Sequence, residues 1–522
     1  MTNLVENVAD AAADHGDAPA VRFRGETHDY AGLWGMTGAF AAGLDDAGVG
    51  PDDRVGLYLP NLPQFVVGFH GTLRAGGVVV PMNPQYKARE IEHLLSDSGA
   101  RVVVCLPDLV PFVEEVRDDT AVERVVTVGE TDAETAAGTE TFASFCGDPE
   151  FGTADRADDD VACQPYTSGT TGTPKGVLLT HENLRSNAEM AATLPVGGLR
   201  PDDRQLGVLP LFHIYGMTVV MNATLFSGAS YHPLPSWDPQ EAMDLVESEG
   251  LTMMHGVPAM YNDIVNQPDA EERSLDSLRM CGVGGAGIPV EVLRRFEDLF
   301  DVEIYEGYGL TETSPVTHFN SPSEGRRVGS IGRTLPGVSA TVVDDEFREL
   351  PPVERGPVDE GAVDLDEITG ELVVAGPNVM KGYHGRDADT RDVFTERDGT
   401  RWFHTGDIGY HDEDGFYYVV DRQKHTINTA GYNVYPREVE ELLFEHEAVA
   451  DAAVVGVPDD RRGETVKAFV VKRPGAEVTA DEIREFCLTS LAEYKHPREV
   501  VFVDELPRTT TGKVQKFELR GE

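Results

Sequence analysis

Basic residues are scarce in this chain of 522 residues: 43 lysines and arginines stand against 91 aspartates and glutamates, a formal net charge of −48. Only nine of the basic residues are lysine. A surface of this sign repels nucleic acids and anionic lipid headgroups, which excludes proteins that bind either one through a basic face. The acidic residues are scattered and form no ligand set, so we attribute them to adaptation to high salt and predict a halophilic source.

Cysteine is also sparse, and long apolar runs are absent. The five cysteines lie far apart with no CxxC pair, which argues against a disulfide framework and a zinc ribbon. No stretch of 18 apolar residues occurs, and residues 1–17 lack both the basic and the apolar region of a secretory signal. We therefore expect a cytoplasmic protein with no membrane span.

Apolar residues are patterned as alternating strands and helices from residue 54 onward. A βαβ succession of this kind implies a parallel sheet and an α/β fold. The elements expected from periodicity are strands at 54–60, 77–81 and 101–105 and helices at 61–75 and 88–98.

Two acidic or proline-rich stretches, residues 129–160 and 344–366, carry no sustained apolar period and are expected to be exposed connections. The pattern changes again near residue 421. There, Pro436 stands at a helix start, and Thr479 with Glu482 forms a capping box. We expect a large domain over residues 1–421 and a small α+β domain over residues 422–522.

Residues 166–176, YTSGTTGTPKG, combine the hydroxyls of four threonines and one serine with three glycines and one lysine. Glycines let backbone N–H groups approach an anion, hydroxyls donate further hydrogen bonds, and a lysine supplies charge. This composition suits a polyphosphate. It is not a Walker A loop, because Pro174 stands where the second glycine of that motif would be. A flexible loop without a ligand is the alternative for this segment taken alone.

Further motifs follow in a fixed order along nearly the whole chain. With them the sequence resembles the adenylate-forming superfamily, and within it the acyl-CoA synthetases and fatty-acid CoA ligases. The carriers of the resemblance are residues 166–176, LPLFHIYG at 209–216, GGAGIP at 284–289, YGLTET at 308–313, GELVVAGPNVMKGY at 370–383, FHTGDIG at 403–409, VDRQKHTINTAGYNVYPREVE at 420–440 and PRTTTGKVQK at 507–516.

The resemblance implies a large domain of parallel-sheet subdomains with a small β subdomain, and a mobile C-terminal domain that swings about Lys424. It implies ATP, Mg²⁺ and CoA as cofactors. Tyr308 would stack on adenine, and Asp407, assisted by Arg422, would accept the ribose hydroxyls. The β- and γ-phosphates would be held by Thr167, Ser168, Gly169, Thr170, Thr171, Gly172 and Lys175.

The same resemblance assigns the chemistry. Glu312 would hold Mg²⁺, which prefers hard oxygen ligands, and Thr311 would contact phosphate. Lys513 would bridge the substrate carboxylate and the α-phosphate while negative charge develops there. His213 would lie beside the substrate carboxylate. After pyrophosphate leaves, Gly431 and Tyr432 would line the path of the CoA thiol.

The walls of the acyl site are expected from Tyr215, Gly216, Gly284 and Gly307, with Gly285 and Ala286 next to them and to the nucleotide. Glycines at wall positions leave room for an extended chain, so we favour a medium- or long-chain fatty acid over an aryl acid. A carrier-protein thiol as acceptor, a luciferase-like oxidation and a non-catalytic acyl- or adenylate-binding protein stay open as alternatives. A homodimer is compatible with the resemblance.

Overall fold

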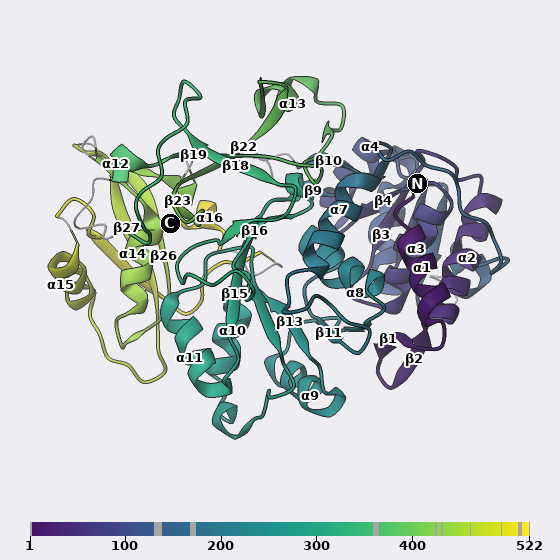
Figure 1. The fold of residues 1–522 in the computed structure, drawn as a ribbon, viewed down its shortest axis with the longest axis horizontal. Coiled ribbons are helices and arrows are strands. Elements are labelled where there is room, and N and C mark those ends of the chain that lie inside the picture. The colour runs from purple at the N-terminus through teal and green to yellow at the C-terminus, as the bar shows by residue number, and fades with distance from the viewer. Residues whose placement is uncertain are drawn as a thin grey trace.

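The computed structural model of the chain describes residues 3–129, 138–167, 174–358, 365–422, 425–429, 432–459, 461–491, 493–509 and 514–520, with the backbone alone at 366, 432 and 433. Figure 1 shows a mixed α/β architecture, in which a large N-terminal part, purple to green, adjoins a smaller yellow-green C-terminal part. This confirms the expected α/β class, with parallel-sheet units, a small β unit and a C-terminal α+β unit.

The first sheet runs in the order β17-β16-β15-β14-β13-β11-β12-β1-β2. Its neighbours from β1 and β12 through to β15 are parallel, so the carboxyl ends of β11, β13, β14 and β15 meet at one edge. Ligands bind at this edge in open α/β sheets. The strands are β1 Pro19–Phe23, β2 Glu26–Asp29, β11 Arg204–Gly207, β12 Ser230–Pro233, β13 Met253–Gly256, β14 Met280–Val283, β15 Ile304–Gly309, β16 Val316–Phe319 and β17 Arg333–Thr334.

The second sheet runs in the order β20-β10-β8-β4-β3-β5-β6-β7, and β9 pairs with β10. The predicted βαβ succession is confirmed here, since α3 (Pro63–Arg74) and α4 (Ala88–Ser98) separate three parallel strands. The strands are β3 Arg54–Tyr58, β4 Val78–Pro81, β5 Val102–Cys105, β6 Arg124–Thr127, β7 Glu140–Thr141, β8 Val161–Cys163, β9 Tyr166–Thr167, β10 Lys175–Thr180 and β20 Gly382–Tyr383.

The prediction that residues 129–160 form an exposed connection holds for most of the described side chains over 138–160, but Phe145 and Arg156 are buried. A short helix, α6 (Phe142–Phe145), packs onto α2 (Tyr30–Asp46) there, and Phe145 is buried with its ring centroid 5.4 Å from that of Phe40. The approach is close, because a Cβ at Gly43 would come within 2.0 Å of the carbonyl oxygen of Phe145. The only signal of this contact in the sequence was the presence of aromatic residues within a polar stretch.

The third sheet forms the small β unit, with β18, β19, β22 and β21 in order and β23 paired to β22. Asp407 on β22 lies opposite Arg422 on β23 in the antiparallel register, which brings two predicted site residues together. The elements are β18 Ser339–Val343, α12 Leu365–Ile368, β19 Gly370–Ala375, α13 Asp387–Asp392, β21 Phe394–Arg397, β22 Thr400–His411 and β23 Tyr417–Arg422.

The fourth sheet, with β25, β24, β27 and β26 in order and β28 paired to β27, has its own apolar core. Pro436 occupies the first turn of α14, and Thr479 and Glu482 cap α15 as expected. Figure 1 shows α14 and α15 at the left, far from α1 and α2 at the right. The elements are β24 Ile427–Thr429, β25 Tyr432–Val434, α14 Pro436–Phe444, β26 Val449–Asp459, β27 Gly463–Lys472, α15 Ala480–Ser490, β28 Glu499–Val503 and α16 Lys516–Leu519.

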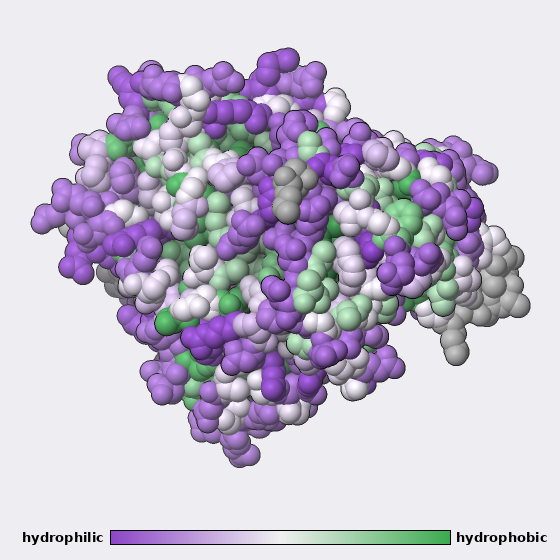
Figure 2. Space-filling view, turned by 45° about the vertical axis from the view of Figure 1, so that its right-hand side comes forward, coloured by the Kyte–Doolittle hydropathy of each residue, from purple (hydrophilic) through white to green (hydrophobic). Residues whose placement is uncertain are grey.

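The other helices cover the faces of the first two sheets. They are α1 Glu6–His15, α5 Val110–Val116, α7 His181–Ala192, a π-helix at Tyr215–Asn222, α8 Ala223–Phe226, α9 Pro239–Glu249, α10 Pro258–Val265 and α11 Val290–Phe300, with single turns at Pro107–Leu109, Arg117–Asp119, Ala270–Glu272 and Thr311–Thr313. Within the described ranges no helix is long and apolar enough to cross a bilayer. All five cysteines are free thiols, as expected. Figure 2 shows hydrophilic residues over most of one face, with hydrophobic atoms in patches between them.

Candidate active site

A cavity of about 720 Å³ opens at the carboxyl ends of β11, β13, β14 and β15. The loops that follow these strands carry the motifs singled out in the sequence, so residues distant along the chain face one space. The cavity gathers a large share of the predicted residues, namely Thr167, Lys175, His213, Tyr215, Gly284, Gly285, Gly307, Tyr308, Thr311, Glu312 and Arg422.

Other predicted residues lie elsewhere. Gly216 does not line this cavity; a Cβ there would come within 2.6 Å of the carbonyl oxygens of Leu209 and Pro210, so close backbone packing requires this glycine. Ala286 and Asp407 face a neighbouring cavity, described below. The predictions for Ser168, Gly169, Thr170, Thr171, Gly172, Lys424, Gly431, Lys513 and the side chain of Tyr432 fall outside the described residues.

Asp407 lies at the centre of a buried hydrogen-bonded group. Arg422 Nε is 2.9 Å from Asp407 Oδ1, and the Tyr308 hydroxyl donates to Oδ2 at 2.5 Å. Burial and the neighbouring Asp407 both raise the pKa of Tyr308 well above its usual value, so this hydroxyl keeps its proton and acts as a donor. The carboxylate is thereby held in one orientation next to the aromatic ring of Tyr308.

Glu371 and His404, which the sequence reasoning missed, support the turn that precedes Asp407. Glu371 Oε2 is 2.7 Å from His404 Nδ1, and Glu371 Oε1 accepts the N–H of Gly406 at 3.0 Å. Gly406 has φ +70°, a conformation that glycine adopts without strain. Both missed residues fall inside the quoted motifs 370–383 and 403–409, which was the available signal.

Charged groups also gather around Glu312. The Tyr383 hydroxyl donates to Glu312 Oε1 at 2.9 Å, and Lys175 Nζ pairs with Asp389 Oδ2 at 3.0 Å. Lys175 lies 5.2 Å from the centre of the Tyr383 ring. In the part of the chain that is described, no three His, Cys, Asp or Glu side chains converge as a complete metal site. A single carboxylate fits Mg²⁺ that takes its other ligands from phosphate and water.

The remaining wall of the cavity is mostly apolar. Gly284 and Gly307 leave room for aromatic rings. A Cβ added at Gly284 would come 3.1 Å from Tyr215 Cε1, and a Cβ added at Gly307 would come 2.8 Å from Phe319 Cδ2. His213 Nδ1 accepts the backbone N–H of Tyr215 at 3.2 Å, which orients the imidazole. The apolar side chains of this wall are Leu194, Leu209, Phe212, Val219, Val257, Val316 and Phe319. His255, also missed, lies among them.

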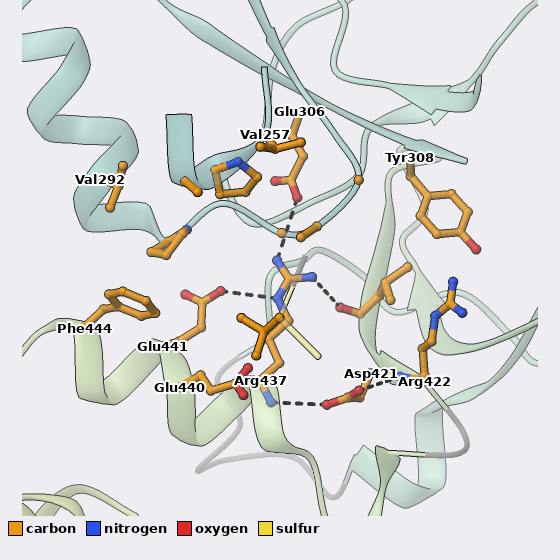
Figure 3. Close-up of a pocket in the computed structure, with 18 of the residues that line it drawn as sticks. Val257, Val292, Glu306, Tyr308, Asp421, Arg422, Arg437, Glu440, Glu441 and Phe444 are labelled. Carbon is orange, nitrogen blue, oxygen red and sulfur yellow. Dashed lines mark hydrogen bonds and ion pairs between the residues drawn. The ribbon is translucent and has the colours of Figure 1, made fainter. Parts of the chain in front are cut away.

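A second cavity, of about 280 Å³, separates the large N-terminal part from α14 and is drawn in Figure 3. Arg437 of α14 reaches across it, with its guanidinium 3.8 Å from Glu306 of β15 and 3.4 Å from Glu441. Burial raises the pKa of Glu306 to about 7, and Arg437 opposes that rise. A Cβ at Gly287 would come within 2.3 Å of the guanidinium, so this glycine makes room for it.

Comparisons with known proteins agree with this geometry. Residues 8–384 match the AMP-binding enzyme family, and residues 438–513 match the AMP-binding enzyme C-terminal domain. The long-chain-fatty-acid–CoA ligase of Bacillus subtilis strain 168 is 37% identical over 541 aligned residues, covering 99% of this chain and 93% of that protein. A feruloyl-CoA synthase of Amycolatopsis is 37% identical over 504 residues, covering 96% and 95%.

Among solved structures, the ATP-bound MatB from Rhodopseudomonas palustris superposes with a TM-score of 0.88 at 33% identity, covering 100% of this chain and 99% of that one. The two matched domains define an adenylate-forming enzyme. The chain belongs to the AMP-binding enzyme family. Within that family it is an AMP-forming acid–CoA ligase of the acyl-CoA synthetase branch.

Proposed function

We propose that the protein activates a medium- or long-chain fatty acid with ATP and Mg²⁺, releases pyrophosphate, and transfers the acyl group to CoA. The observation that carries the proposal is a single cavity in which Tyr308, Glu312 and Arg422 share space with an apolar wall. Such a cavity suits a nucleotide and an aliphatic acid bound side by side.

The proposed binding of ATP rests on the hydrogen-bonded group around Asp407. Its carboxylate would exchange the Tyr308 hydroxyl for the ribose hydroxyls, with Arg422 keeping it oriented at 2.9 Å. The ring of Tyr308 would then stack on adenine. Lys175 would leave Asp389 for the phosphates, together with Thr167, Ser168, Gly169, Thr170, Thr171 and Gly172.

In the first half-reaction a carboxylate oxygen of the acid attacks the α-phosphorus, and the bond from that phosphorus to the bridging oxygen of pyrophosphate breaks. Lys513 and His213 would stabilise the charge on the reacting oxygens, while Glu312 holds Mg²⁺ and Thr311 contacts phosphate. The described residues on either side of Lys513 support its role, because Thr509 lines the nucleotide cavity and Val514 lines the cavity against α14.

In the second half-reaction the CoA thiolate attacks the acyl carbonyl and AMP leaves. We propose that the domain of residues 422–522 turns about Lys424 between the two steps, withdrawing Lys513 and bringing Gly431 and Tyr432 to the thiol path. Gly285 and Ala286 would border that path, since Gly285 lines both cavities and Ala286 the one against α14.

A fatty acid is favoured because aliphatic and aromatic side chains dominate the acyl wall and because the B. subtilis relative is named a long-chain-fatty-acid–CoA ligase. The feruloyl-CoA synthase is equally identical, so an aryl acid is the second candidate. Cytoplasmic location, a halophilic source and a homodimer stay predictions. Light scattering in molar salt would measure whether the protein is a homodimer.

Pyrophosphate release and CoA-dependent AMP formation, measured over straight-chain acids of increasing length and a set of aryl acids, test the proposal. Activity that rises with chain length supports it. A preference for aryl acids would indicate an aryl ligase instead. Adenylate that accumulates despite CoA would indicate a ligase that uses a carrier-protein thiol. No pyrophosphate with any acid would indicate a binding protein.

Lys513→Ala is expected to abolish pyrophosphate release but to leave thioester formation from preformed adenylate largely intact. Lys87→Ala, which removes an exposed lysine that lines neither cavity, is the matched control. Equal loss of both half-reactions in Lys513→Ala would contradict the division of roles.

A further inference from the structure

One polar pair interrupts the apolar wall of the acyl site. The Tyr215 hydroxyl and His255 Nδ1 are 3.1 Å apart, and their rings meet edge to face with centroids 5.8 Å apart. His255 lies on β13 at the carboxyl edge of the sheet and is 4% exposed, yet it lines the cavity. The ring packs over the backbone of Gly282, where a Cβ would come within 2.4 Å of Nδ1.

The hydrogen bond decides which nitrogen of His255 carries the proton. Burial raises the pKa of the Tyr215 hydroxyl, which therefore keeps its proton, and we assign this hydroxyl as the donor to Nδ1, the group that it contacts. In a neutral imidazole the other nitrogen, Nε2, then carries the hydrogen. Burial lowers the pKa of His255 to about 4, so the ring is neutral at ordinary pH.

The Nε2–H group is an available donor. No further hydrogen bond to this ring is made by the residues that the structure describes. Nε2 is also not sealed inside protein, in contrast with the enclosed Nε2 atoms of His181 and His318, and the face that His255 leaves open is the cavity. An apolar chain passing this point would leave a buried donor without a partner.

We propose that His255 is a specificity-determining residue that selects acids bearing a hydrogen-bond acceptor oxygen on the acyl chain over plain alkyl acids of the same length. Tyr215 is the positioning residue that keeps the proton on Nε2. The inference rests on the proposed acyl-activating function and narrows its substrate class. Because the neighbouring wall side chains Val219 and Phe319 are apolar, an oxygen that lies against them finds no such partner and loses its hydration.

The test compares decanoate with a series of oxodecanoates, each with a keto group at a different carbon. A keto oxygen accepts a hydrogen bond but does not donate one, so it tests only whether the substrate can accept the Nε2–H hydrogen bond. Pyrophosphate release gives kcat/KM for each acid. At the best position the oxo acid should exceed decanoate by roughly tenfold to hundredfold, the effect of satisfying one buried donor.

Four variants make the result specific. His255→Leu should remove the preference or reverse it, and His255→Gln, which offers an amide donor, should restore part of it. Tyr215→Phe should weaken it, because the proton is then free to move to Nδ1. Val219→Ala, a change of wall volume without polarity, should alter kcat/KM for both acids by a similar factor.

If no oxo acid exceeds decanoate, or if His255→Leu keeps the wild-type ratio, the inference is overturned and Nε2 is satisfied by water. A preference lost equally in Val219→Ala would also overturn it, because shape would then be the cause. Absence of pyrophosphate with every acid refutes the proposed function itself, which distinguishes the two failures.

Discussion

Arg437→Met is expected to slow adenylation selectively. In Figure 3 the Arg437 guanidinium lies between Glu306 of the large N-terminal part and Glu441 of its own helix. Its backbone N–H also donates to Asp421 at 3.2 Å. The guanidinium therefore ties α14 to β15 in the arrangement in which Thr509 borders the cavity of about 720 Å³. Methionine keeps much of the length of arginine but removes the charge.

The size of the effect follows from the geometry. Two unit charges 3.8 Å apart attract by roughly 4 kcal/mol at an effective dielectric constant of about 20. Desolvation of both groups offsets much of this, which leaves roughly 1–2 kcal/mol of net coupling. That corresponds to a loss of roughly fivefold to thirtyfold in the population of the docked arrangement, and to the same loss in the rate of pyrophosphate release.

The loss in the rate of pyrophosphate release in Arg437→Met should depend on pH. Because burial raises the pKa of Glu306 from its ordinary 4.5 to about 7, the folded protein retains a proton that the unfolded chain releases. The stability gained from this proton is complete below pH 4.5 and is lost as the pH rises through 7. Without Arg437 the pKa of Glu306 rises further. The variant should therefore be impaired less at about pH 6 than at about pH 8, since Glu306 is neutral at the lower pH.

The assay measures both half-reactions at each pH: single-turnover pyrophosphate release, and thioester formation from preformed acyl-adenylate. Arg437→Met should slow the first more than the second, and adding Glu306→Gln should restore part of the loss. Gly287→Ala, whose Cβ would displace the guanidinium, is expected to act in the same direction. Equal slowing of both half-reactions at every pH, with no rescue by Glu306→Gln, would refute the reasoning.

Asp407→Asn should raise the KM for ATP roughly tenfold to hundredfold and leave the KM for CoA unchanged, because an amide is a weaker acceptor for ribose hydroxyls; equal rises would contradict this. Glu312→Gln should increase the Mg²⁺ concentration needed for half-maximal pyrophosphate release several-fold, and an unchanged Mg²⁺ titration would remove Glu312 from the metal. Transfer from molar to low salt should unfold the protein without urea, as followed by circular dichroism, because the net charge of −48 is then unscreened; a spectrum indifferent to salt would contradict salt adaptation.

Local features were predictable from the sequence because contiguous residues determine them. The helix 88–98 and the Thr479 cap depend on periodicity and on hydrogen bonds within one turn, and both are confirmed. The contact of Phe145 with α2 was missed because one buried aromatic residue in a polar stretch produces no period.

The residues of the candidate site also divide into those that the sequence predicted and those that only the structure could place. The motifs predicted Tyr308, Glu312 and Arg422 as site residues, and the structure brings all three to one cavity, since each follows or forms the end of a strand. Gly216 belongs to the same motif as His213, yet it packs against backbone rather than lining the cavity. A motif marks a segment, but the direction of each residue depends on the helix or strand that forms there.

The sequence by itself determined the family and the acidic character of the whole chain, because composition and short motifs need no partner. Only the tertiary structure decided that Tyr215 meets His255 and that Arg437 meets Glu306. The members of these pairs lie far apart along the chain, and sheet register and the seating of α14 bring them together. Side-chain interactions of this kind depend on distances of a few Å, which no spacing in the sequence specifies.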